Sequence, residues 1–231
     1  MNIAIIPARG GSKRIPRKNI KSFFGVPIIG YAIKVAAESE VFDKIVVSTD
    51  DNEIAEIARS FGASVPWIRA SQLSDDFATT VSVMQDAVKK LDSNLVNIEN
   101  VCCIYPTTPL LKPEHLIEGL RILNDGKWDY VVAASRSKTP LERFLTIGEN
   151  HEIVMRFPEH ETSRTQDLPL AYNDAGQFYW GKKTSWESAL PLFTSRATIL
   201  EIPRECVIDV DTPDDWQYAE RMYSAFGKDP S

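Results

Sequence analysis

Short, uninterrupted apolar runs alternate along the chain with segments of helical period. The runs are rich in β-branched and aromatic residues, a texture typical of strands covered on both faces of a sheet. They occupy residues 3–6, 45–47, 101–105, 130–133 and 199–202.

Between the runs lie three stripes of apolar residues with the spacing of one helix face, i, i+3, i+4 and i+7. Gly62 is placed to end the first helix, and Pro113 suits the first turn of the third. The stripes are Ile54, Ile57, Ala58 and Phe61; Met84, Ala87, Val88 and Leu91; and Leu116, Leu120 and Leu123. This alternation predicts an α/β fold with a mostly parallel sheet, helices on both faces, and ligands beyond the carboxyl ends of the strands.

Residues 136–173 break this rhythm, because polar, aromatic and proline residues mix there without a helical period. Alternation at residues 144–147 and 153–157, around Gly148, predicts a hairpin. We therefore expect a single domain over residues 1–231 with an inserted, protruding arm. An arm with exposed aromatic residues usually meets a partner, so a homodimer is expected.

Charge is distributed unevenly. The chain has 26 Lys and Arg against 32 Asp and Glu, a net charge of −6, yet five of the cations fall in "PARGGSKRIPRKN", residues 7–19. Local positive charge favours a small anionic ligand over nucleic acid. The three cysteines have neither a disulfide framework nor metal-ligand spacing, so we expect buried thiols in a reducing cytoplasm. No run approaches about 18 apolar residues, and no membrane contact is expected.

A strand, a glycine-rich turn and then cations is an arrangement typical of phosphate binding, in which backbone N–H groups at Gly10 and Gly11 can converge on anionic oxygens. A Walker A loop would need glycine in place of Ile15, and the dinucleotide motif would need it in place of Ser12. Neither motif fits.

We instead predict a triphosphate cradle at this loop. Phosphate contacts are assigned to Arg9, Ser12, Lys13 and Lys18, and Asn19 is assigned to base, sugar or loop. The alternative is a solvated loop whose cations merely cluster, or a weak nucleic-acid patch. Like charges this close repel unless an anion joins them, which favours the cradle.

The segment "VIDVDTPDDW", residues 207–216, sets Asp209 and Asp211 at alternate positions, so an extended chain projects both from one face. Two hard oxygen ligands can share Mg²⁺, or Mn²⁺, bound to nucleotide phosphates. The alternative is a strand end whose acids cap the next helix. We assign that capping role to Asp214 and Asp215, which follow a good N-cap at Thr212.

The string "AIIPARGGSKRIPRKN", residues 4–19, resembles the signature of the cytidylyltransferases that activate nonulosonic acids, the CMP-sialic acid synthetase family. The resemblance implies a Rossmann-like sheet of the nucleotide-diphospho-sugar transferase type with a protruding, β-containing dimerisation arm. It implies CTP and an acidic nine-carbon sugar as substrates, and metal binding by Asp209 and Asp211. It further implies a role in cell-surface glycan biosynthesis such as flagellin glycosylation.

Two further segments carry the resemblance on the nucleotide side. "WIRASQLSDDFATT", residues 67–80, is similar to the family's R-P-x-x-L-(A/S)-x-D segment, and "YPTTP", residues 105–109, to its Q-P-T-S-P. Nucleotide contacts are thereby implied for Arg69, Thr80 and Thr107. Arg69 could otherwise be a surface residue at a strand end, and Thr80 a helix cap. Tyr105 replaces a sugar-holding Gln, which argues against ordinary sialic acid.

"RTQD" and "DAGQFYWG", downstream of "FPEH", are similar to the pseudaminic acid members of the family. The alternative for these positions is packing of the arm and its interface. Sugar contacts are implied for Tyr105, Arg164, Gln166, Asp174, Gln177 and Tyr179.

The expected reaction is in-line attack of the sugar's anomeric hydroxyl on the α-phosphorus of CTP, with release of pyrophosphate. Positioning and charge neutralisation dominate such transfers. Rival substrates are N-acetylneuraminic acid, legionaminic acid and Kdo, and a rival class is a nucleotide-sensing or sugar-binding module without turnover. The catalytic assignments are Arg9, Lys13, Lys18, Asp209 and Asp211.

Overall fold

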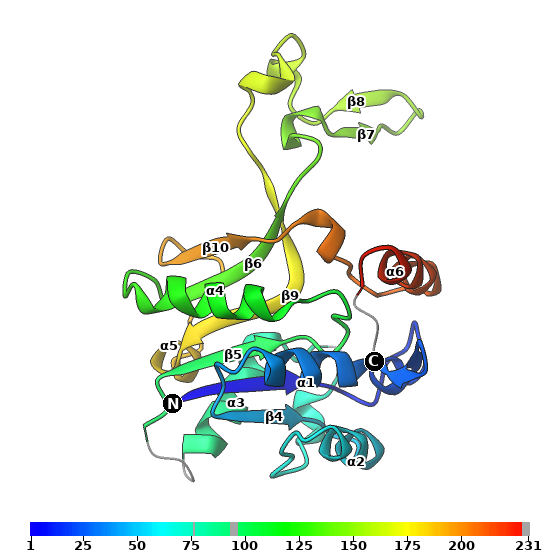
Figure 1. Ribbon diagram of the computed structural model, residues 1–231. Helices are drawn as coiled ribbons and strands as arrows, with labels where there is room; N and C mark the ends of the chain where they lie inside the picture. The colour runs from blue at the N-terminus through cyan, green and yellow to red at the C-terminus, as the bar shows by residue number, and fades with distance from the viewer. Residues whose placement is uncertain (76, 93–96, 228–231) are drawn as a thin grey trace.

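A computed structural model describes residues 1–75, 77–92 and 97–227. Its centre is a six-stranded sheet in the order β10-β6-β9-β5-β1-β4 (Figure 1). The strands are β1 (Asn2–Pro7), β4 (Lys44–Ser48), β5 (Asn100–Ile104), β6 (Tyr130–Arg136), β9 (Tyr172–Lys182) and β10 (Ala197–Glu201).

The sheet is mostly parallel, as predicted. β1 pairs in parallel with β4 and β5, and β10 pairs in parallel with β6. The exception is β9, which runs antiparallel between β5 and β6. All five predicted strand runs are confirmed, whereas β9 was predicted as a sugar-site motif and not as a strand.

Helices cover both faces of the sheet (Figure 1). On one face pack α1 (Ile28–Glu38), α2 (Asn52–Ser60) and α4 (Pro113–Asn124), and on the other α3 (Thr80–Asp92) and α5 (Lys183–Glu187). The three predicted helices are confirmed as α2, α3 and α4, and α1 was not predicted. The helix α6 (Pro213–Phe226) packs against the segments that follow β1 and β5.

Burial on both faces explains the uninterrupted apolar runs. Along β1, Ala4 and Ile6 belong to the core under α1 and α4, whereas Ile3 and Ile5 belong to the core under α3. The same division separates the adjacent thiols at positions 102 and 103. Burial raises the pKa of both thiols, as expected for inert packing residues.

Short elements complete the chain. Two-residue strands β2 (Ser22–Phe23) and β3 (Val26–Pro27) form a small ribbon after the basic loop. The 3₁₀ turns are η1 (Lys18–Ile20), η2 (Ser71–Leu73), η3 (Leu141–Arg143), η4 (Pro158–His160), η5 (Thr165–Asp167) and η6 (Arg204–Cys206).

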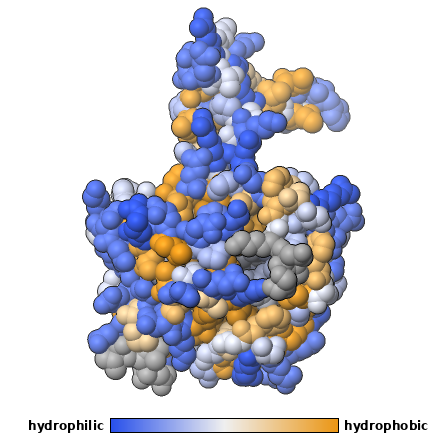
Figure 2. All heavy atoms as spheres, in the orientation of Figure 1, coloured by the Kyte–Doolittle hydropathy of each residue, from blue (hydrophilic) through white to orange (hydrophobic). Residues whose placement is uncertain are grey.

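The predicted arm rises from β6 and β9, two inner strands of the sheet (Figure 1). Its base is the last pair of that ladder, Arg136 opposite Tyr172. Its tip carries the predicted hairpin, β7 (Leu145–Ile147) antiparallel to β8 (Ile153–Met155). Hydrophobic residues are exposed along the arm (Figure 2), among them Leu141, Phe144, Leu145, Ile147, Ile153 and Leu170.

Candidate active site

A cavity of about 440 Å³ opens where β1 and β5 end, beside the start of α3 and the segment that precedes α6. Its position matches the prediction of a ligand at the carboxyl edge of the sheet. The lining also includes Arg14, which was not predicted. The predicted residues that line it are Arg9, Ser12, Lys13, Lys18, Asn19, Arg69, Thr80, Tyr105, Thr107 and Asp211.

Two segments 192 positions apart meet at this cavity. Lys18 Nζ donates to the Val210 carbonyl oxygen at 2.6 Å and lies 3.3 Å from Asp211 Oδ1. Arg14 Nη2 lies 2.8 Å from Asp211 Oδ2. The basic loop and the acidic segment therefore face the same space.

Alternation in the acidic segment explains this placement. Ile208 and Val210 are buried against Trp216, while Asp209 between them is exposed. Asp209 and Asp211 thus share the outward side of an extended stretch, as predicted, but only Asp211 is among the described residues that line the cavity. The next helix, α6, begins with the capping box expected at Thr212, in which the N3 side chain is Asp215.

The two carboxylates fit a hard divalent cation that arrives with a phosphate ligand. The pKa of Asp209 is raised, first because the carboxyl is partly desolvated and then because the Asp211 charge lies nearby. A cation shared by both oxygens would relieve that repulsion. Among the described residues no group of three or more His, Cys, Asp or Glu could hold a metal, so the other ligands would be phosphate oxygens and water.

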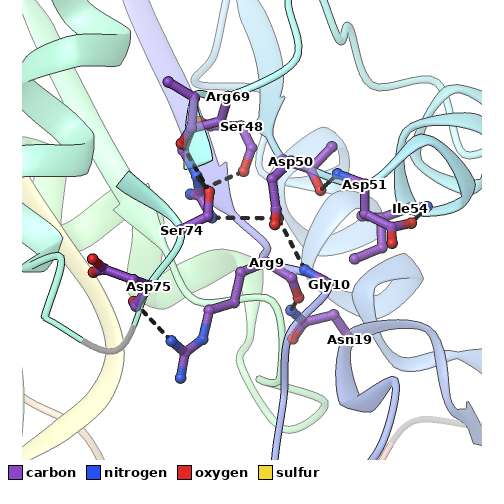
Figure 3. A network of polar contacts seen from close by, with 12 residues as sticks. Arg9, Gly10, Asn19, Ser48, Asp50, Asp51, Ile54, Arg69, Ser74 and Asp75 are labelled. Carbon is purple, nitrogen blue, oxygen red and sulfur yellow. Dashed lines mark hydrogen bonds and ion pairs between the residues drawn. The ribbon is translucent and has the colours of Figure 1, made fainter. Parts of the chain in front are cut away.

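Buried polar contacts hold the loop after β1. Asn19 is 6% exposed, and its Nδ2 donates to the Arg9 carbonyl oxygen at 2.9 Å. Gly10 N donates to Asp50 Oδ1 at 3.0 Å (Figure 3). The Gly10 N–H is therefore engaged by a carboxylate at the end of β4, and neither Gly10 nor Gly11 is among the described residues that line the cavity.

Arg69 lies at the back of the cavity and is only 4% exposed, so the alternative of a surface arginine is wrong. Its Nε donates to Ser74 Oγ at 3.0 Å, and its Nη1 donates to the Ser48 carbonyl oxygen at 3.3 Å (Figure 3). Burial lowers the pKa of Arg69, and the nearby Asp50 carboxylate opposes that shift. Asp76, which corresponds to the final Asp of the family's R-P-x-x-L-(A/S)-x-D segment, lies outside the described residues.

Tyr105 lines the cavity on the β5 side and is backed by the buried Tyr179, which is not among the described residues that line it. Tyr105 Oη lies 2.7 Å from Thr80 Oγ1, and the Tyr105 ring meets the Tyr179 ring edge-on at 5.7 Å. Tyr179 Oη donates to Asp174 Oδ2 at 2.5 Å. Burial raises the pKa of Tyr105 to about 12, so its hydroxyl stays protonated at neutral pH. The cap of α3 is Thr79, whose Oγ1 accepts from Ser82 N, so the capping alternative for Thr80 is wrong.

The structure does not bring every predicted sugar residue to this cavity. Arg164 and Gln166 lie in the arm, next to and within η5. Gln177 is buried in the sheet, its Nε2 donates to the Cys206 carbonyl oxygen, and its Oε1 has no partner in the described part of the chain. Asp174 is exposed on β9 and accepts from the buried Tyr179, and neither of the two is among the described residues that line the cavity.

Comparison with known proteins agrees with this geometry. The profile of the cytidylyltransferase family matches residues 3–226. The chain belongs to the cytidylyltransferase family. It is 40% identical over 222 residues to the pseudaminic acid cytidylyltransferase of Campylobacter jejuni subsp. jejuni serotype O:2, covering 96% of each chain. It is 30% identical over 230 residues to the CMP-N,N'-diacetyllegionaminic acid synthase of Legionella pneumophila, covering 95% of each.

The fold of this cytidylyltransferase is similar to that of solved structures. A CMP:2-keto-3-deoxy-manno-octonic acid synthetase complexed with CTP superposes with a TM-score of 0.71, covering 97% of this chain and 98% of the other. At 15% identity the likeness concerns the fold. In the described ranges, no helix combines the length and apolar character needed to cross a bilayer.

Proposed function

We propose that this cytidylyltransferase transfers CMP from CTP to the anomeric hydroxyl of a nonulosonic acid, pseudaminic acid, and releases pyrophosphate. The observation that carries the proposal is the meeting of Lys18 with Val210 and Asp211 at one cavity. The sugar assignment rests on the 40% identical relative and on the aromatic residue at position 105.

The chain's own groups would do three things for the reaction. Lys13, Lys18 and Arg9 line the cavity as cations and would neutralise the triphosphate, including the charge that develops on pyrophosphate. Arg69 would hold the nucleotide from the back of the cavity. Mg²⁺ or Mn²⁺ on Asp209 and Asp211 would polarise the phosphate and lower the pKa of the attacking hydroxyl.

The sugar would lie towards Tyr105, on the β5 side of the cavity. Tyr105 presents a protonated hydroxyl next to Thr80, a donor and acceptor pair suited to a sugar amide or hydroxyl. Arg164 and Gln166 lie in the arm and would contact a sugar only if an arm lay over a cavity. We therefore propose a homodimer in which the arm of each copy contacts the neighbouring copy. The setting we propose is the cytoplasm and the biosynthesis of surface glycans such as those on flagellin.

The test is pyrophosphate release with CTP, Mg²⁺ and a panel of pseudaminic, N,N'-diacetyllegionaminic, N-acetylneuraminic and Kdo acids. We expect kcat/KM for pseudaminic acid to exceed that for each other sugar by at least about 10-fold, the discrimination of one well-made polar contact. Preference for N-acetylneuraminic or legionaminic acid would keep the transfer and overturn the sugar. Nucleotide binding without release of pyrophosphate from CTP in the presence of any of these sugars would show that the protein is not this enzyme.

A further inference from the structure

One cation of the basic loop does not line the cavity, in contrast to the other four. Arg9, Lys13, Arg14 and Lys18 line the cavity, whereas Arg17 does not. The Arg17 backbone is left-handed, with φ 55° and ψ 31°, a conformation that side-chain-bearing residues rarely adopt. The turn there directs the Arg17 side chain away from the cavity and leaves the next residue, Lys18, facing it.

Arg17 is anchored to the start of α2. Its Nη1 and Nη2 donate to Asp51 Oδ2 and Oδ1 at 2.5 and 3.0 Å, and its Nη2 also donates to Glu53 Oε2 at 2.5 Å. Asp51 Oδ1 accepts in addition from Ile54 N, the capping contact of α2. The hydrogen bond from Arg17 is the main reason why the pKa of Asp51 is lowered to about 2. The strained turn is thus held by a bidentate ion pair on a helix end.

Asp51 and its neighbour Asp50 also lie against the other end of the loop. Gly10 N donates to Asp50 Oδ1, and a Cβ at Gly10 would lie 2.7 Å from Asp51 Oδ2 and 3.0 Å from Asp51 Cβ. Glycine is therefore required at position 10 by close approach to Asp51. Both ends of the loop rest on two adjacent carboxylates at the end of β4.

We propose that Asp50 and Asp51 form a carboxylate clamp that fixes both ends of the loop, and that Arg17 is a positioning residue which keeps Lys18 and its neighbours aimed at the triphosphate. The identity of the anion rests on the proposed function; the clamp itself rests on the contacts around Gly10 and Arg17. Four cations on one short loop repel one another, so an anchored backbone keeps them close before the nucleotide arrives.

Two variants remove the ion pair between Arg17 and Asp51 without removing the cap of α2, and a third weakens that pair. Asp51→Asn keeps an oxygen that can cap α2 but removes the charge that holds Arg17. Arg17→Gly leaves Asp51 and the cap intact and suits the left-handed backbone, so it decides the question if Asp51→Asn folds poorly. Arg17→Lys keeps the charge without the bidentate fork and should fall between wild type and Arg17→Gly. The matched control is Glu118→Gln, which breaks a similar pair with Arg121 on α4.

The first measurement needs no nucleotide. Limited trypsin digestion of the full chain, followed by mass spectrometry, gives the rate of cleavage between Arg14 and Ile15. We expect that rate to rise at least about 5-fold in Asp51→Asn and Arg17→Gly and to stay at the wild-type value in Glu118→Gln, since local opening exposes the loop. Unchanged cleavage in both variants overturns the clamp.

The second measurement is the Kd of CTP with Mg²⁺ by titration calorimetry. We expect binding to weaken at least about 10-fold in both variants while the thermal midpoint shifts by only a few degrees. A looser loop with an unchanged Kd overturns the positioning role. If the wild type binds no CTP while cleavage still responds, the proposed function fails and the clamp stands.

Discussion

The basic loop and the arm both leave the sheet as irregular segments after a strand, β1 in one case and β6 in the other, yet different contacts hold them. The loop is tied to the body of the same chain by the hydrogen bond from Gly10 N to Asp50 and by the Arg17 pair with Asp51. The arm instead displays apolar side chains to solvent, with Ile147 and Ile153 each 76% exposed.

This difference separates a self-sufficient region from an incomplete one. The loop's polar groups find partners within one chain, so its shape is fixed without help. The hairpin at the tip of the arm has two short strands with mostly exposed side chains, and an isolated hairpin of that kind is marginally stable in water. The shape of the basic loop therefore needs no second copy, whereas the exposed apolar side chains of the arm are suited to one.

The largest expected effect comes from the acidic segment that faces the basic loop across the cavity. Asp209→Asn and Asp211→Asn should each lower kcat at least about 10²-fold, the scale of a lost charge contact in the transition state. The measurement is steady-state pyrophosphate release over a range of Mg²⁺ concentrations. Asp214→Asn, an exposed acid on the first turn of α6, is the control and should stay near wild type. Wild-type turnover in both variants at limiting Mg²⁺ would show that these carboxylates hold no metal.

The arm is tested by a change that keeps the hairpin paired. Ile147 and Ile153 face each other across β7 and β8, so Ile147→Lys with Ile153→Glu replaces two apolar side chains by an attractive pair. We expect the dimer dissociation constant to rise at least about 100-fold, because each buried Ile contributes about 1.5–3 kcal/mol. Light scattering across a dilution series measures it. Phe193→Ser, at another exposed apolar position, is the control, and a wild type that is monomeric throughout contradicts the dimer.

The boundary between nucleotide and sugar is tested at Tyr105. Tyr105→Phe removes the partner of the Thr80 hydroxyl while keeping the ring, and we expect KM for the sugar to rise about 10-fold with KM for CTP within about twofold. Initial rates with each substrate varied in turn give both constants. Tyr218→Phe, an exposed tyrosine on α6, provides the comparison. A rise confined to CTP would assign Tyr105 to the nucleotide.

The smallest expected effect concerns pH and the anchored loop. The folded pKa of Asp51, about 2, lies below its ordinary value of 3.8, so its ion pair stabilises the fold above about pH 4 and is lost as pH falls towards 2. Asp51→Asn should therefore lower the free energy of unfolding by about 1–2 kcal/mol at pH 7. Urea denaturation at a series of pH values should show that difference shrinking below pH 4. A difference that does not change with pH would mean that the charge of Asp51 contributes nothing to stability.

Much of the fold could be predicted because strands that are buried on both faces of the sheet consist almost entirely of apolar residues. Residues 3–6 are apolar throughout since successive side chains enter two different cores. The helix α1 escaped prediction because its apolar residues do not form a narrow stripe; even Gly30 is buried, where a Cβ would lie 2.7 Å from the Phe61 ring. The strand β9 was not predicted because its residues were interpreted only as a motif for sugar binding.

The candidate site was predictable in its residue types but not in their directions. Five cations in thirteen positions indicated an anion, yet nothing in the spacing showed that Arg17 turns away to Asp51 while Arg14 joins the cavity. Those directions depend on one left-handed residue and on carboxylates in the turn between β4 and α2, which lies more than thirty positions away in the sequence. Long-range contacts of this kind leave no local pattern.

The antiparallel placement of β9 has a mechanical consequence. The two legs of the arm are continuous with β6 and β9, which pair from Arg136–Tyr172 to Ala134–Asp174 and, beyond a register shift, from Val132–Tyr179 to Tyr130–Gly181. A torque on the arm tip would therefore reach Asp174 first, because the register shift lies between Asp174 and Tyr179. Whatever grips the arm would then act on the Tyr179 ring, which backs Tyr105, through the hydrogen bond between the Tyr179 hydroxyl and Asp174 as well as through the backbone.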